Sequence, residues 1–266
     1  VFIGCTPILS IDASTQNVYH FSDTDKNISL LDISETFGTY DGSFVLYDNN
    51  LDSWKIYDLE EATKRIPPES TYKIYDALLG LESGIITPEH SSMTWNGDAF
   101  PFPSWEADQD LNSAMQNSVN WYFQAIDSQL GINRVQEFLN KIEYGNQTTS
   151  SNLDLYWSDF SLKISPLEQV TLLKKFNTNE FHLNSQNVFS VKNAIKIAST
   201  PNGNFYGKTG TGRVNGQDIN GWFIGYVETS DNSYYFATNI QSDSNATGKK
   251  AFEITSDILK KLHIWN

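Results

Sequence analysis

Ser70 and Lys73 form an S-x-x-K tetrad at the start of an expected helix. Residues three apart share one helical face, with Cβ atoms roughly 5–6 Å apart, so the hydroxyl and the amine would be neighbours. A serine hydroxyl is a weak nucleophile until a base takes its proton. Lysine can be that base only when an apolar pocket lowers its pKa. The tetrad indicates nucleophilic chemistry, although helix capping explains most such tetrads taken alone.

Ser118 and Asn120 form an S-x-N triplet in a second expected helix. A second hydroxyl near the nucleophile could relay a proton to a leaving nitrogen, and an amide could bond a substrate amide. On its own, the triplet is also typical of ordinary polar helix surface. It gains meaning only if the fold brings Ser118 close to Ser70.

The run Lys208-Thr209-Gly210-Thr211-Gly212 falls on an expected strand. Lys208 supplies a cation for a substrate carboxylate, and the hydroxyls of Thr209 and Thr211 supply hydrogen-bond donors. Gly210 lets the backbone approach a ligand closely. The alternative is a lysine on an edge strand beside a turn, with no ligand.

The composition is that of a folded chain. Its 266 residues are 39% hydrophobic and 14% aromatic, enough for a sizeable core. The net charge of −14 disfavours nucleic acid and anionic lipid surfaces as partners. Cys5 is the one cysteine, and the four histidines lack ligand spacing, so we expect no disulfide within the chain and no metal.

The pattern of apolar residues predicts a mixed α/β fold. Aromatic and β-branched runs at 43–47 and 54–57 predict a β-hairpin. Further elements are expected as helices at 72–84, 111–130, 135–142, 166–176 and 248–262, and as strands at 205–212, 221–228 and 234–240. Strands at both ends of the chain, with helices between them, predict one sheet whose two halves meet, and the short turns between the last three strands make that part antiparallel.

The first 37 residues differ in texture from the rest. Val1–Leu9 is apolar but too short to span a bilayer. It is interpreted as the end of a transmembrane helix, as a lipoprotein-like box with Cys5 lipidated, or as a tail without a role. Residues 11–37 are expected to be a polar linker. We therefore expect a membrane-proximal start and linker at 1–37 and one domain at 38–266.

In this order, the three segments resemble the S-x-x-K, S-x-N and K-T-G set of penicillin-recognising serine enzymes. Three co-ordered matches are much harder to obtain by chance than one. The resemblance implies a β-lactamase/transpeptidase-like fold, in which a central antiparallel sheet is flanked by helices and an all-helical region is inserted. It also implies β-lactam ligands, penicillins and cephalosporins. It implies that Ser70 is acylated, that Lys73 is its base and that Ser118 shuttles the proton. Lys208, Thr209 and Thr211 would then meet the substrate carboxylate, and the N–H groups of Ser70 and Thr211 would form the oxyanion hole.

Longer stretches narrow the resemblance. Tyr144–Asn146, Tyr156–Gln169 and Gly221–Tyr226 are similar to class D (oxacillinase-type) β-lactamases. In that group the lysine matching Lys73 is carboxylated by carbon dioxide and held by the tryptophan matching Trp157, which we place with the binding residues. Ser70–Tyr75, Ser118–Phe123 and Tyr234–Thr238 resemble the sensor domains of BlaR/MecR β-lactam signal transducers more closely.

That closer resemblance implies a location and partners. In BlaR/MecR transducers a membrane-embedded metalloprotease portion precedes the sensor. We therefore expect a domain on the outer side of the cell membrane of a Gram-positive-type bacterium, attached through a segment upstream of Val1. Its signal would induce antibiotic resistance.

Asn120 separates two interpretations. Class D hydrolases usually have an apolar residue there, and an apolar wall favours a neutral, carboxylated lysine. A polar amide would bond the amine, favour loss of the carboxylate after acylation and leave no base for water. We expect a sensor that is acylated quickly and released slowly, with a class D hydrolase and a D,D-peptidase as alternatives. Glu69 receives no role, and Lys249–Lys250 stands where class D enzymes use an arginine.

Overall fold

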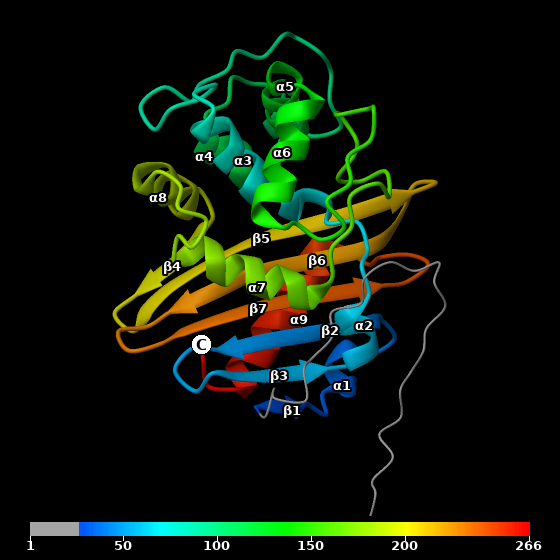
Figure 1. The fold of residues 1–266 in the computed structure, drawn as a ribbon. Coiled ribbons are helices and arrows are strands. Elements are labelled where there is room, and N and C mark those ends of the chain that lie inside the picture. The colour runs from blue at the N-terminus through cyan, green and yellow to red at the C-terminus, as the bar shows by residue number, and fades with distance from the viewer. Residues whose placement is uncertain (1–26) are drawn as a thin grey trace, which may run out of the picture.

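Residues 27–266 are described by a computed structural model in which one twisted sheet carries helices on both faces (Figure 1). Val1–Leu9, including Cys5, lies outside the described residues, so its three interpretations stay predictions. Within residues 27–266, no helix combines the length and the apolar character that crossing a membrane requires.

In the described part of the chain, the sheet has seven strands in the order β1-β3-β2-β7-β6-β5-β4. Only β1 pairs in parallel, with β3; all other neighbours are antiparallel. The strands are β1 (Ile28–Leu30), β2 (Asp41–Asp48), β3 (Ser53–Tyr57), β4 (Lys196–Thr200), β5 (Gly203–Val214), β6 (Gln217–Glu228) and β7 (Ser233–Gln241). Because β2 pairs with β7, the two ends of the described chain meet in the middle of the sheet.

The helices divide between the two faces and an end region. They are α1 (Ser34–Phe37), α2 (Leu59–Thr63), α3 (Lys73–Glu82), α4 (Leu111–Gln116), α5 (Asn120–Leu130), α6 (Ile132–Ile142), α7 (Pro166–Asn177), α8 (Ser185–Ala194) and α9 (Gly248–Lys261), with 3-10 turns η1 (Glu69–Tyr72) and η2 (Pro103–Trp105). Helix α9 packs on one face, α7 crosses the other, and α3 to α6 with α8 form a helical region beyond the sheet (Figure 1).

Side chains fix where several helices begin. Asp110 and Ser113 form a reciprocal capping box at α4. Ser165 and Glu168 form another at α7, with Pro166 in the first turn. These caps satisfy backbone N–H groups that a helix leaves unpaired, so the sequence itself sets the two boundaries.

Among the described residues, two clusters of buried apolar side chains form the core. The larger runs from the sheet strands through α3, α5, α6 and α7, and includes Val45, Tyr226, Ile126 and Leu139. The smaller lies between the sheet and α9, around Phe223. The helical region therefore shares its core with the sheet and is not a separate body.

The mixed α/β prediction, with a central antiparallel sheet and inserted helices, is confirmed. The predicted hairpin is β2–β3, and the three late strands are β5 to β7. The single helix predicted at 111–130 is wrong, because the chain breaks at Ser118 and forms α4 and α5. Sequence reasoning missed α8 and β4. Ordered structure begins before Gly38, since β1 and α1 fall in the expected linker.

Candidate active site

The nucleophile turn η1 places Ser70 beside Lys73. Pro67-Pro68 precedes the turn, and the Thr71 hydroxyl donates to the Pro68 carbonyl at 2.6 Å. Lys73 is the first residue of α3, and its Nζ lies 2.7 Å from Oγ of Ser70. The predicted pairing of hydroxyl and amine is therefore present in the structure.

Lys73 is fully buried, and no carboxylate among the described residues lies within ion-pair distance of it. Its Nζ also donates to Oδ1 of Asn120 at 2.7 Å, and lies 5.7 Å from the ring centroids of both Phe123 and Trp157. Burial, and then the charge of Lys208, hold the pKa of Lys73 well below its usual value of 10.5. A neutral amine can accept the proton of Ser70.

Ser118 sits in the break between α4 and α5, with a left-handed backbone of φ 56°. Non-glycine residues in that region cluster at functional sites, where surrounding contacts over-determine them. Nζ of Lys208 donates to Oγ of Ser118 at 2.8 Å and to the Thr209 carbonyl at 3.1 Å. Desolvation lowers the pKa of Lys208 to about 7. The second and third motifs are thus joined by one hydrogen bond.

Strand β5 passes directly against the nucleophile turn. A Cβ added to Gly210 would lie 3.1 Å from Cβ of Glu69 and 3.3 Å from the backbone nitrogen of Ser70. A side chain at this position would press on the nucleophile turn, so glycine suits the close approach. On the same strand, Oγ1 of Thr211 accepts the backbone N–H of Gly248, where α9 begins.

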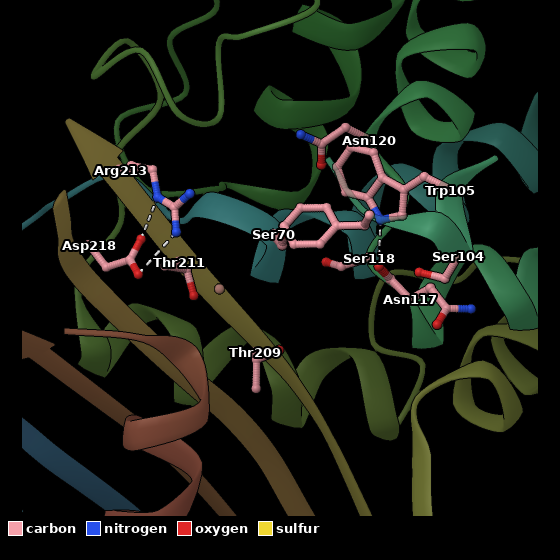
Figure 2. Close-up of a pocket in the computed structure, with 12 residues that line it drawn as sticks. Ser70, Ser104, Trp105, Asn117, Ser118, Asn120, Thr209, Thr211, Arg213 and Asp218 are labelled. Atoms are coloured by element: carbon pink, nitrogen blue, oxygen red, sulfur yellow. Dashed lines mark hydrogen bonds and ion pairs between the residues drawn. The ribbon is translucent and has the colours of Figure 1, made fainter. Parts of the chain in front are cut away.

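These groups surround an open cleft of about 360 Å³. Figure 2 shows Ser70 and Ser118 facing Thr209 and Thr211 across it. The lining residues are Ser70, Phe102, Ser104, Trp105, Asn117, Ser118, Asn120, Thr209, Gly210, Thr211, Arg213 and Asp218. Trp157 is not among the lining residues, because its side chain is only 2% exposed. It lies beside Lys73, as predicted, but it does not face the cleft where a substrate would bind.

Sequence reasoning missed the cation at the cleft mouth. Arg213 lines the cleft, and its guanidinium donates to Asp218 at 2.7 and 3.2 Å (Figure 2). Thr209, Thr211 and Arg213 alternate along β5, and that period of two was the available signal. Among residues 27–266, no group of three or more His, Cys, Asp or Glu side chains could hold a metal ion.

The fold and these three motifs define a penicillin-recognising serine domain. A model of the penicillin binding protein transpeptidase domain matches residues 34–260, and the chain belongs to that family.

Particular relatives narrow this further. The chain is 45% identical to the regulatory protein BlaR1 of Bacillus licheniformis over 98% of its length, and 39% identical to the methicillin resistance mecR1 protein of Staphylococcus aureus over 99%. It spans only 43% and 46% of those proteins.

Solved structures agree with the sequence matches. The C-terminal domain of the Bacillus licheniformis BlaR penicillin-receptor superposes with a TM-score of 0.88 at 46% identity, covering 90% of this chain and 98% of that one. A class D β-lactamase from Bacillus subtilis gives 0.83 at 36%, covering 89% and 97%. The resemblance to BlaR/MecR domains is confirmed and is stronger than that to class D enzymes.

Proposed function

We propose that this domain is a β-lactam receptor. Its Ser70 forms a covalent adduct with the ligand, and the adduct is released slowly. The observation that carries the proposal is the position of Lys73 Nζ, buried and 2.7 Å from both Ser70 Oγ and Asn120 Oδ1. The contact with Ser70 supplies a base for acylation. The contact with Asn120 keeps the amine from acting as a base once Ser70 is acylated.

Acylation follows from the free amine of Lys73. The amine takes the Ser70 proton, Oγ attacks the lactam carbonyl, and the backbone N–H groups of Ser70 and Thr211 receive the negative charge on the carbonyl oxygen. The ring C–N bond then breaks, and Ser118 passes a proton to the departing nitrogen. Ser118 draws on Lys208, whose ammonium already donates to its oxygen at 2.8 Å.

The residues around Lys73 also fit its carboxylation. A neutral amine in an apolar pocket is the form that combines with carbon dioxide, and Trp157 and Phe123 supply such walls. A carboxylated Lys73 would supply a carbamate oxygen as the base at the same place. Trp157 would hold it there.

Slow release follows from Asn120. Its Oδ1 accepts from Lys73 Nζ and so favours the free, protonated amine once Ser70 has given up its proton. A protonated amine cannot activate water, so the ester between Ser70 and the opened ring persists. The alternative is a class D hydrolase with fast turnover, favoured by the likeness to the Bacillus subtilis enzyme.

The chain spans less than half of its BlaR1 and mecR1 relatives, and we propose that its whole protein has a membrane-embedded metalloprotease portion before this domain. The domain would then lie outside a Gram-positive-type cell and report β-lactams to induce resistance. Sequencing the gene upstream of Val1 tests this: transmembrane segments with H-E-x-x-H support it, and a short signal peptide contradicts it.

Intact-mass spectrometry tests the receptor itself. The domain is mixed with a penicillin, excess ligand is removed, and the mass is followed for hours, with Ser70→Ala as control. We expect a whole-penicillin adduct on the wild type that lasts for hours and none on the variant. An adduct lost within seconds would support the hydrolase, and uptake by Ser70→Ala would overturn the role of Ser70.

A further inference from the structure

Glu69, directly before the nucleophile, is buried in an unusual backbone conformation. It is 6% exposed, and its φ of 51° lies in the left-handed region. Its N–H donates to the Trp157 carbonyl at 3.1 Å. A glutamate gains nothing from this conformation by itself, so neighbouring contacts must hold it there.

The Glu69 carboxyl is held by a polar cluster from the sheet. Nδ2 of Asn220 on β6 donates to Oε1 of Glu69 at 3.2 Å and to the Pro67 carbonyl at 3.1 Å. Nε1 of Trp222 donates to the same carbonyl at 2.8 Å. Asn220 is itself fixed, because Asn239 on β7 donates to its Oδ1 at 2.9 Å. The nucleophile turn is thus bonded to β6, and through it to β7.

The Glu69 side chain also packs on β5, at two positions where that strand has glycine. A Cβ on Gly212 would lie 2.3 Å from Oε1 of Glu69 and 2.8 Å from its Cδ. A Cβ on Gly210 would lie 3.1 Å from Cβ of Glu69. Glu69 therefore fills the gap between the turn that carries Ser70 and the strand segment that carries Thr211.

We propose that Glu69 is a positioning residue whose buried side chain, bonded to Asn220 and seated on Gly210 and Gly212, sets the spacing between the Ser70 turn and β5. That spacing is the width of the oxyanion hole, which needs N–H groups from both sides. The inference rests on the proposed acylation of Ser70 and adds a determinant of its rate.

The neutral carboxyl suits this role. Burial raises the pKa of Glu69 to about 8, against smaller lowering effects of Asn220 and the Lys73 charge. Other charged groups nearby are Arg213 on β5, which is paired with Asp218 on β6, and Glu61 of α2, reached through Gln241. In the part of the chain that the structure describes, no cation forms an ion pair with this carboxylate, so ionisation above pH 8 places an unpaired charge beside the turn.

Two substitutions separate shape from charge. Glu69→Gln keeps the size and the acceptor for Asn220, and Glu69→Ala removes both. We expect Glu69→Ala to lower the acylation rate constant by about tenfold or more, since small misplacements of reacting groups have such effects. Glu69→Gln should acylate within about threefold of wild type at pH 7, because both forms are then neutral. Above pH 8, the acylation rate constant of the wild type should fall below that of Glu69→Gln, because only the wild type has a carboxyl there to ionise.

A double-mutant cycle that combines Glu69→Ala with Gly212→Ala gives a second, separate test of the inference. The new methyl group clashes with Glu69, so it should slow acylation in the wild type and much less in Glu69→Ala. Equal acylation of wild type and Glu69→Ala at all pH values, or additive effects in the cycle, would overturn the inference. Failure of the wild type to form any adduct would instead overturn the proposed function, so the two failures are distinct.

Discussion

Lys73 Nζ contacts the nucleophile on one side and Asn120 on the other, so replacing Asn120 tests release while Ser70 and Lys73 themselves stay in place. Asn120→Val removes the acceptor for the amine and supplies the apolar wall expected of class D hydrolases. A hydrogen bond to a charged group contributes about 1.5–3 kcal/mol, so deacylation should accelerate by roughly tenfold to a hundredfold. Loss of the adduct with time, followed by intact mass, gives this rate.

The control for this change is Gln124→Val, one turn further along α5. Gln124 donates to the Asp154 carbonyl and is not among the residues that line the cleft. Its adduct should persist as in the wild type. If Asn120→Val also kept its adduct for hours, the Asn120 contact would not be what slows release.

Lys208 makes ligand binding depend on pH. Its pKa of about 7 means that the ammonium is present below pH 7 and is lost as the pH rises through that value. Affinity for a β-lactam carboxylate, measured from the concentration dependence of the acylation rate, should therefore weaken from pH 6 to pH 8. Lys208→Arg keeps its charge over this range and should show a flat profile. Parallel profiles for the two proteins would contradict this role of Lys208.

At the scale of elements, the chain before the nucleophile is tied to α7 by one ion pair. The guanidinium of Arg65 donates to both oxygens of Glu168, with Nε at 3.0 Å from each, and both side chains are less than one-fifth exposed. Glu168 also accepts from Ser165 in the cap of α7. Glu168→Ala should lower the free energy of unfolding by about 2 kcal/mol, because it removes the Glu168 half of the capping box and a bidentate pair.

Denaturant unfolding measures this, with Glu143→Ala as the comparison. Glu143 pairs with Lys175, but its side chain is 71% exposed, so its loss should change stability by less than about 0.5 kcal/mol. Equal effects of the two substitutions would show that the Arg65 pair does not anchor α7.

Some elements are set by the residues within them, and these could be predicted from the sequence. Others are set by contacts with residues far along the chain, and these could not. Aromatic and β-branched runs separated by turn residues predicted β2 and β3, and the helix predicted at 166–176 is α7, whose start a local capping box fixes. The break at Ser118 could not be predicted, since its residue types are tolerated in helices and its conformation is fixed by contact with Lys208 on β5. Helix α8 was missed because its buried stripe is thin, although Asn184 caps it.

At the scale of the whole molecule, the three motifs meet because the sheet brings β5 to the helical region. Their order in the chain predicted that they belong together, but only topology shows how. Arg213 and Asp218 were overlooked for a related reason: the period of two along β5 points to Arg213, but only the pairing of β5 with β6 brings Asp218 to it at the lining of the cleft. The use of Glu69 likewise depends on β6, about 150 residues further along the chain.

The continuous core predicts that sheet and helical region unfold together. Ile126 is fully buried on α5, so close to α3 that a Cβ on Gly80 would lie 3.0 Å from its Cγ2, and Phe223 is 1% exposed beneath α9. Ile126→Ala should cost about 2–5 kcal/mol and Phe223→Ala about 3–5 kcal/mol. Because the larger cluster joins α5 to β2 and β6, each substitution should shift one shared transition seen by circular dichroism and by tryptophan fluorescence.

The control is Phe189→Ala. This side chain is 57% exposed, so its loss should change the free energy of unfolding by less than about 0.5 kcal/mol. A separate early transition in Ile126→Ala would mean that the helical region unfolds on its own, and that the cleft can open without loss of the sheet.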